Sequence, residues 1–323
     1  MKIACRILAV AIAVSAAAYP SSLKAATDVA YLFAHMTKED YGRLYYSVST
    51  DALHWTTLNN GRRILDDYRG HPDICKGHDN RYYLIGNYEH RPEITLWVSD
   101  DLITWSRFRD FTPDIYKTPD FKPAIDYKGA PKIFYDADSG RYLITWHSTL
   151  LPPIKDDTEQ FWRGMRTLYV TSTDLKTFTD PKRLFDFEIA TIDTIIRKEG
   201  SRYYAFIKDE KYPDFSWPTG KTIRVCTADN LLGPYTEPSP PITANFYEAP
   251  TLIARPDGKG WYLYCEQYPA VSWGLSTAPT LAGPWHNIYW QDYQTPKNAR
   301  HGAMIQITKT EYDKLLAAYP HQP

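Results

Sequence analysis

The chain of 323 residues carries 37 Lys and Arg against 38 Asp and Glu, a formal net charge of −1. That balance argues against a nucleic-acid-binding protein, which would show a basic excess or stripe. A hydrophobic fraction of 43% with 15% aromatic residues excludes a disordered chain. Because Tyr (26) and Trp (10) far outnumber Met (4), the composition favours strands over helices.

The N-terminal residues 1–26 are typical of a secretory signal peptide. Lys2 and Arg6 give a charged start, and residues 7–18 form an apolar run that is too short to span a membrane. Cleavage is expected near Ala25 or Ala26. We therefore expect an exported protein, periplasmic or extracellular; the alternative is a core helix at the N-terminus. No second long apolar segment follows, so we expect no membrane span.

Three cysteines remain after the signal peptide, namely Cys75, Cys226 and Cys265. All lie in apolar, strand-like runs, and an odd number excludes a fully paired disulfide framework. Buried free thiols are the favoured interpretation. One disulfide with one free thiol is the alternative in an oxidising compartment.

One sequence plan recurs five times along the mature chain. An apolar strand is followed by a turn, a pair of large residues that is mostly aromatic, and a closing Ser/Thr-rich element that ends on an aromatic residue. The pairs begin at Tyr45, Tyr82, Tyr142, Tyr203 and Trp261, and the closing elements span 49–55, 99–105, 172–178, 227–235 and 276–285. From the second pair on, the interval is about sixty residues, and the strands alternate apolar and polar positions.

Repeats of this length with short strands predict a β-propeller. A single four-stranded blade cannot bury both of its faces, whereas blades packed radially bury them and leave short edges. The first segment, 29–65, lacks a leading strand, and the last strand, 302–308, lacks partners of its own. We therefore predict five blades in one domain, 27–323, closed by the C-terminal strand completing the N-terminal blade. Helical period appears at 310–319, and a β-sandwich is the alternative fold.

In such a ring the leading strands converge on the central axis, so polar residues at their starts face one cavity. These starts read His71-Pro72-Asp73, Ala130-Pro131, Ile192-Asp193-Thr194, Glu248-Ala249-Pro250 and Arg300-His301-Gly302. Three carry a carboxylate and two carry a histidine. Converging carboxylates suit glycoside hydrolysis, in which one acid protonates the leaving oxygen and a second activates water. Flat aromatic faces would bind sugar rings, and the candidates are Trp146, Trp162, Trp217 and Trp273.

The ordered pattern resembles the family 43 glycoside hydrolases, which are five-bladed propellers acting on arabinose-, xylose- and galactofuranose-containing glycans. The resemblance covers residues 28–318. It implies that Glu248, in Glu248-Ala249-Pro250, is the catalytic acid and that Asp193 tunes it. It also implies a central His301 near a structural calcium, although no acidic loop with calcium-site spacing is visible. We add Lys208 and Arg300 as substrate-binding candidates beside it.

The first blade departs from the family's pattern. Aligning the prolines puts His71 where the family's base Asp belongs, and Asp73 follows two residues later. Since side chains alternate along a strand, His71 and Asp73 are expected on the same face. Asp73 is the preferred base, His71 is an alternative because imidazole titrates near neutrality, and loss of the base is a third.

These features together predict an exported, inverting exo-glycosidase acting on furanose or pentose side chains. The resemblance favours α-L-arabinofuranosidase or β-galactofuranosidase activity over β-xylosidase activity. The alternatives are a catalytically silent sugar-binding propeller, suggested by His71, and a protein-interaction propeller. Loops at 150–166 and 212–218 are expected to rim the pocket. We expect an oligosaccharide or polysaccharide as the partner, no required cofactor, no nucleic acid and a monomer.

Overall fold

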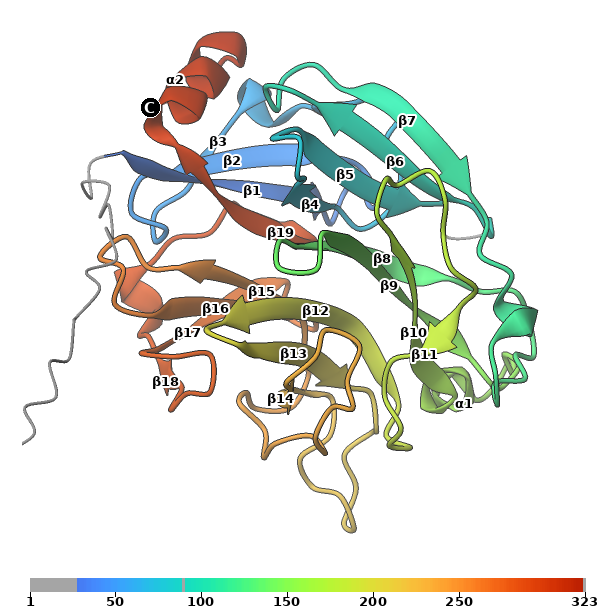
Figure 1. The fold of residues 1–323 in the computed structure, drawn as a ribbon. Coiled ribbons are helices and arrows are strands. Elements are labelled where there is room, and N and C mark those ends of the chain that lie inside the picture. The colour runs from blue at the N-terminus through green and yellow to red at the C-terminus, as the bar shows by residue number, and fades with distance from the viewer. Residues whose placement is uncertain (1–27, 89–90, 322–323) are drawn as a thin grey trace, which may run out of the picture.

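The computed structural model describes residues 28–88 and 91–321 and consists of five antiparallel sheets arranged in a ring (Figure 1). This confirms the predicted five-bladed β-propeller. The predicted signal peptide lies outside the described residues. No described helix has the length and apolar character needed to cross a membrane.

Each blade is a meander whose innermost strand starts beside the central axis. Blade 1 contains β19 (Ala299–Thr308), β1 (Val29–Thr37), β2 (Tyr45–Ser49) and β3 (Thr56–Thr57). Blade 2 contains β4 (Asp73–Lys76), β5 (Tyr82–Asn87), β6 (Ile94–Ser99) and β7 (Ser106–Phe111). Blade 3 contains β8 (Gly129–Asp136), β9 (Arg141–Thr149), β10 (Met165–Ser172) and β11 (Lys182–Arg183). Blade 4 contains β12 (Thr191–Glu199), β13 (Arg202–Asp209) and β14 (Thr222–Ala228), and blade 5 contains β15 (Tyr247–Ala254), β16 (Trp261–Gln267), β17 (Ser272–Ala278) and β18 (His286–Asn287).

The C-terminal strand closes the ring, as predicted. Strand β19 pairs antiparallel with β1, with Val29 opposite Thr308 and Phe33 opposite Met304. Helix α2 (Lys309–Ala318) follows directly, and its Thr308–Glu311 capping box satisfies the first backbone N–H groups. The closure therefore joins the two ends of the described chain within one sheet (Figure 1).

The recurring aromatic pairs explain how neighbouring blades adhere. Adjacent strand residues point to opposite faces, so Tyr82 packs in the core between blades 1 and 2 and Tyr83 in the core between blades 2 and 3. Tyr203 and Tyr204 divide in the same way between the two faces of blade 4. Each of these two pairs thus contributes one buried ring to each of two inter-blade cores.

A shared turn explains the closing elements. In blade 2 the Asp101 carboxylate accepts hydrogen bonds from the backbone N–H groups of Ile103 and Thr104, both at 2.8 Å, while Ser99 Oγ accepts one from Leu102. Leu102 adopts a positive φ of 65°. The same side-chain bonds recur in the elements that begin at Ser49 and Ser172. Ser and Asp are thus required there because they replace the backbone partners that a tight turn lacks.

Irregularities at the strand starts position the central residues. The pairing register shifts at Gly129/Lys132, Ile192/Ile195 and Glu248/Thr251, and each shifted stretch contains a residue with positive φ. Those residues are Ala130 (42°), Asp193 (51°) and Ala249 (47°). A bulge re-aims a side chain at the end of a strand, and non-glycine residues in this conformation concentrate at functional sites.

The three cysteines of the described chain are free thiols, as favoured by the sequence. Cys226 and Cys265 are buried, and Cys75 is half-buried. The secondary structure also contains a short helix α1 (Thr158–Arg163) and three 3₁₀ turns, Asn59–Gly61, Ile115–Lys117 and Trp290–Asp292.

Candidate active site

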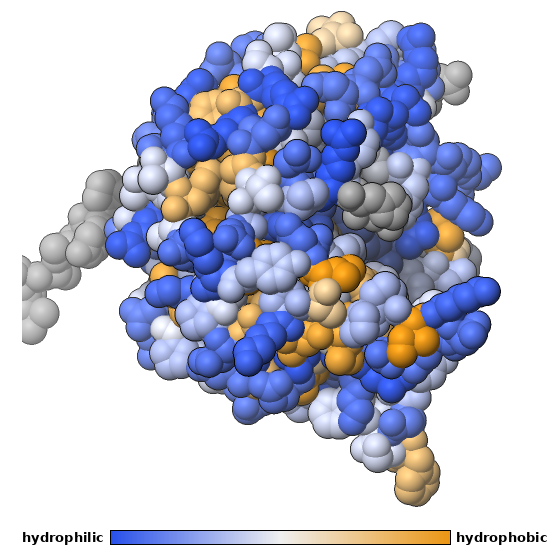
Figure 2. All heavy atoms as spheres, turned by 90° about the vertical axis from the view of Figure 1, so that its right-hand side faces the viewer, coloured by the Kyte–Doolittle hydropathy of each residue, from blue (hydrophilic) through white to orange (hydrophobic). Residues whose placement is uncertain are grey.

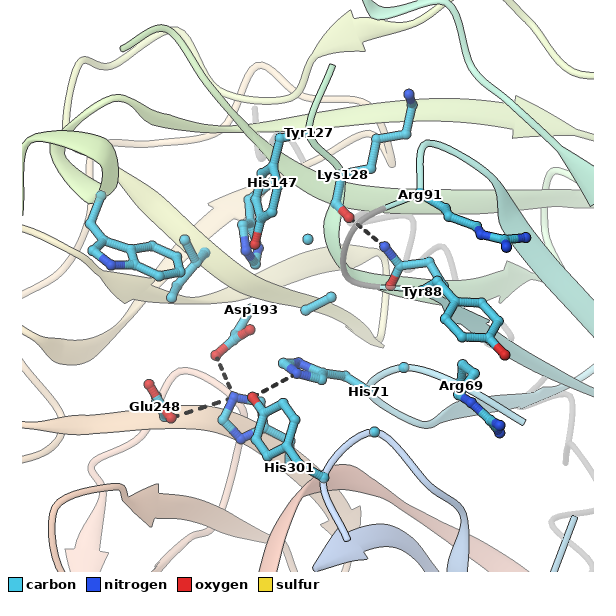
Figure 3. Close-up of a pocket in the computed structure, with 18 residues that line it drawn as sticks. Arg69, His71, Tyr88, Arg91, Tyr127, Lys128, His147, Asp193, Glu248 and His301 are labelled. Atoms are coloured by element: carbon cyan, nitrogen blue, oxygen red, sulfur yellow. Dashed lines mark hydrogen bonds and ion pairs between the residues drawn. The ribbon is translucent and has the colours of Figure 1, made fainter. Parts of the chain in front are cut away.

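A cavity of about 600 Å³ opens at the strand starts of the ring (Figure 3). Asp193, Glu248, His301 and His71 all line it, although they come from four different blades. The sequence-based expectation that polar strand starts meet at one cavity is therefore confirmed for these four residues. The volume falls in the range of pockets that enclose small ligands.

Asp193 is a buried carboxylate held in place by its neighbouring blade. Its Oδ2 accepts a hydrogen bond of 3.1 Å from the backbone N–H of Ala249 and lies 3.8 Å from Nε2 of His301. Burial alone would raise the pKa of Asp193, but the positive charge of His301 and the other surrounding basic groups lowers it overall. Asp193 is therefore ionised across the neutral pH range.

Glu248 lies among three cationic groups. Its Oε2 is 2.8 Å from Nζ of Lys208, and its Oε1 is 3.3 Å from Arg300 and 3.4 Å from Nε2 of His301. Lys208 also contacts Glu210 at 2.8 Å. Burial would lower the pKa of Lys208, but the carboxylates of Glu248 and Glu210 raise it, so the ammonium stays charged.

His301 is oriented by a carboxylate that the sequence analysis did not identify. Its Nδ1 lies 2.7 Å from Oε2 of Glu266, which also accepts a hydrogen bond from the His301 backbone N–H. This directs Nε2 toward Glu248 and Asp193 (Figure 3). Burial opposes a charged imidazole, but Glu248, Glu266 and Asp193 together raise the pKa of His301 above its ordinary value. The sequence signal for Glu266 is its charge, since it follows five apolar residues in strand β16.

His71 and Asp73 separate, in contrast to the expectation that they share a face. Strand β4 begins only at Asp73, so the alternation does not extend back to His71. His71 lines the cavity, with Nε2 2.9 Å from the Tyr41 hydroxyl and Nδ1 buried without a hydrogen-bond partner among the described residues. Burial, aided by repulsion from His301, lowers the pKa of His71 well below its ordinary value.

Asp73 instead joins two blades. Its Oδ2 accepts a 2.8 Å hydrogen bond from the backbone N–H of Ile133 in β8, and the side chain is absent from the cavity lining. An equivalent contact joins blades 5 and 1, where Thr251 Oγ1 accepts a hydrogen bond from the backbone N–H of Met304. Burial raises the pKa of Asp73. This position does not favour Asp73 as the catalytic base.

Some of the other predicted substrate-binding residues lie beside Glu248, and others are buried elsewhere. Lys208 and Arg300 contact Glu248 as described, and Arg300 also pairs with Glu266. Trp146 and Trp273 are buried, with indole N–H groups bonded to Ser148 and to the Ala299 carbonyl, so neither offers a face to a sugar.

The two predicted rim loops also differ. Trp162 in α1 lines the cavity, so the 150–166 loop reaches it. Trp217 donates its N–H to Asp209 and is not part of the lining, and Phe215 in the same 212–218 loop is fully exposed.

Several lining residues had no sequence signal. His147 lies on β9 and faces the cavity from the second strand of its blade, and burial lowers its pKa to about 4. Tyr41, Arg69, Tyr88 and Arg91 lie in connections between strands. Such residues reach the axis only because of how the blades pack, which the local pattern does not encode.

Potential metal ligands gather around His301. Two groups bring ligand atoms within 4.8 Å of one another: His71 with Asp193 and His301, and Glu248 with Glu266 and His301. Calcium requires six to eight oxygen ligands. Here the Glu248 and Glu266 oxygens already pair with Lys208, Arg300 and His301. This donor set does not fit calcium bound directly by protein oxygens. No observation tests the calcium expected near His301, which therefore remains a prediction.

Comparison with known proteins places the chain in a family. A family model described as "Probable glycosyl hydrolase domain", related to glycoside hydrolase family 43, matches residues 27–313. An α-L-arabinofuranosidase of Bifidobacterium longum subsp. longum is 27% identical over 219 residues, which is 59% of this chain and 20% of that protein. The chain thus spans about a fifth of the length of this relative.

Solved structures share the fold. A thermostable family-43 glycoside hydrolase superposes with a TM-score of 0.51 at 18% identity, covering 72% of this chain and 74% of the other. An α-L-arabinofuranosidase from Lactobacillus brevis gives a TM-score of 0.51 at 14% identity, covering 68% and 72%. With the family match over nearly the whole described chain, the chain belongs to the family-43-related glycosyl hydrolases.

Proposed function

We propose that the enzyme is an exported, exo-acting and inverting glycosidase that releases furanose or pentose side-chain residues from a glycan. α-L-Arabinofuranosides and β-galactofuranosides are the favoured substrates, ahead of β-xylosides. The observation that carries the proposal is the meeting of Asp193, Glu248 and His301 at one axial cavity. The arabinofuranosidase relative supports the substrate class.

In this proposal Glu248 delivers the proton to the leaving oxygen. Lys208 and Arg300 hold its carboxyl group in place, and a proton must reach it before bond cleavage. His301 is the proton source within reach, because its imidazolium Nε2 lies 3.4 Å from Glu248 Oε1. The ionised Asp193, whose Oδ2 lies 3.8 Å from the same Nε2, stabilises positive charge that develops at the sugar ring.

We assign the water-activating role to His71. It faces the cavity, whereas Asp73 does not, and its lowered pKa keeps the imidazole neutral and able to accept a proton. A neutral imidazole has one acceptor nitrogen, which is either the buried and unpartnered Nδ1 or the Tyr41-bonded Nε2, depending on the tautomer. A low pKa weakens the base, so modest turnover is expected.

The test uses nitrophenyl α-L-arabinofuranoside, β-galactofuranoside and β-xyloside with wild type and Glu248→Gln. Wild type should cleave a furanoside, and Glu248→Gln should reduce kcat by roughly 10²- to 10⁴-fold, the usual contribution of a general acid. Unchanged activity in Glu248→Gln would refute the acid assignment. Product anomers followed by NMR test inversion. Sugar binding without turnover of any glycan would identify a sugar-binding propeller instead.

A further inference from the structure

A second group of charged residues lines the cavity away from the carboxylates. Arg69 and Arg91 both belong to the lining, and Tyr88 lies between them in the close-up (Figure 3). The guanidinium carbons are 5.2 and 5.3 Å from the Tyr88 ring centroid. Cation–π contacts of this kind hold a guanidinium in place while its N–H groups remain able to bind a ligand.

The two guanidiniums have no acidic partner among residues 28–88 and 91–321 at ion-pair distance. Arg69 uses one nitrogen, Nη1, to donate to the backbone carbonyls of Asp66 and Tyr68 at 2.8 and 2.6 Å. Its Nε and Nη2 make no hydrogen bond to a described residue. The Arg91 guanidinium lies over the ring of Tyr88, a residue that is 46% exposed, and the Arg91 backbone N–H donates to the Tyr88 carbonyl at 3.0 Å.

The carboxylates of the same cavity do not neutralise this pair. Asp193 and Glu248 are engaged by His301, Lys208 and Arg300. Figure 3 shows Arg69, Tyr88 and Arg91 on the other side of the cavity, with His71 between them and Glu248. The cavity therefore has a catalytic side, where the carboxylates already have cationic partners, and a second side formed by Arg69 and Arg91.

We propose that Arg69 and Arg91, with Tyr88 between them, bind an anionic group on the glycan, a sugar carboxylate or sulfate ester, in the unit next to the residue that is cleaved. The planar guanidinium fork matches a carboxylate or sulfate and binds it with charge-assisted hydrogen bonds. The aromatic face of Tyr88 offers contact to the same sugar ring. This deepens the proposed function, on which it rests, by selecting acidic glycans over neutral ones.

The experiment measures binding and turnover separately. Methyl glucuronide, methyl 6-sulfogalactoside and methyl galactoside are titrated into wild type and Glu248→Gln, calorimetrically and at low and high salt. At least one anionic sugar should bind about tenfold or more tightly than the neutral one, as charge-assisted bonds allow. High salt should reduce this preference. The anionic sugar that binds more tightly shows whether the site prefers a carboxylate or a sulfate ester.

Variants then test whether this preference comes from Arg69 and Arg91 with Tyr88 between them, which together we call the clamp. Arg69→Met with Arg91→Met should abolish it, and Arg69→Lys with Arg91→Lys should retain part of it, because the charge remains but the fork is lost. Arg202→Met is the matched control: Arg202 is exposed, pairs with Asp229, and lies at the opposite end of β13 from Lys208, so it should bind like wild type. Circular dichroism checks that each variant is folded.

Two failures are distinguishable. Furanoside turnover with equal binding of all three methyl sugars, or an anion preference that survives both Met substitutions, would overturn the clamp while leaving the proposed function intact. An anion preference without turnover would support the clamp and refute the glycosidase proposal.

Discussion

The two candidates for the base, His71 and Asp73, make opposite predictions. If His71 activates the water, His71→Asn should reduce kcat by roughly 10²- to 10⁴-fold. Asp73→Asn keeps an oxygen that can accept the bond from Ile133 and should cost less than about tenfold. Steady-state kinetics on the best furanoside measure both. If Asp73→Asn reduces kcat more than His71→Asn does, Asp73 is the base and the assignment to His71 is wrong.

The pH profile provides an independent test of the same residue. The pKa of His71 is lowered well below its ordinary value, so the ring stays unprotonated as the pH falls to 6. We therefore expect kcat/KM to stay constant down to pH 6 and to decrease only in more acidic solution. An acid limb centred near pH 6.5 would instead indicate an unperturbed histidine.

Lys208 was predicted to bind substrate, yet the structure places it between Glu248 and Glu210. Lys208→Met should leave two buried carboxylates with less compensation and destabilise the protein by roughly 3–5 kcal/mol, with a fall in kcat. Urea unfolding measures the first effect. Lys309→Met is the control, since Lys309 makes an exposed helical pair with Asp313 that is worth about 0.5 kcal/mol or less. Equal losses in both variants would contradict the buried-pair interpretation.

At the level of single residues, the sequence predicted the convergence of Asp193, Glu248 and His301 but not their contacts. Convergence follows from ring topology, and each of these residues stands at the start of an innermost strand. The contacts depend on which side chain of a second strand enters the centre, as Glu266 of β16 does. The His71–Asp73 expectation failed because alternation holds only within a strand, and β4 starts at Asp73.

The closing turn is the element whose sequence requirement can be measured directly. Asp101→Ala removes the acceptor for the backbone N–H groups of Ile103 and Thr104 beside the positive φ of Leu102. Loss of such a side-chain cap should cost about 1–2 kcal/mol in urea unfolding. Asp100→Ala is the adjacent control, because Asp100 is exposed and makes no hydrogen bond to a described residue. Equal stability of the two variants would show that the turn does not depend on Asp101.

The bulges at the strand starts illustrate what a period-2 pattern does not contain. The alternating pattern predicted strands β12 and β15. It did not predict the register shifts in these strands, which leave Asp193 and Ala249 unpaired and with a positive φ. The shift is stabilised across blades, since the Ala249 N–H bonds to Asp193 itself. A feature held by a neighbouring blade cannot be derived from the strand that carries it.

For the whole molecule, the repeat determined the architecture because every blade needs both neighbours to bury its faces. The ring then closes through β19 and β1. It also gathers His71, His147 and His301 around one buried centre, with ring centroids of His71 and His301 4.3 Å apart. A protein that buries several histidines should be sensitive to acid, and the direction follows from proton linkage.

Three histidines have lowered pKa values: His35 and His147 at about 4, and His71 well below its ordinary value, in each case because loss of solvent around the ring disfavours its charged form. Between pH 6.5 and 4 the unfolded chain binds more protons at these sites than the folded protein, so stability falls as pH falls. At His35 and at His147 this should cost about 2 kcal/mol each by pH 5. His301, whose pKa is raised, contributes stability that is already fully present below pH 6.5 and does not offset this loss.

His35 allows the effect to be isolated away from the active site. It bonds to Ser47 Oγ and the Met36 carbonyl within blade 1 and does not line the cavity. In urea unfolding at pH 7.5 and 5.0, His35→Asn should lose about 2 kcal/mol less between the two pH values than wild type does. His286→Asn, on the exposed strand β18, should lose as much as wild type. If His35→Asn shows the full wild-type loss, burial of His35 is not a source of the acid sensitivity, and carboxylate protonation must account for it.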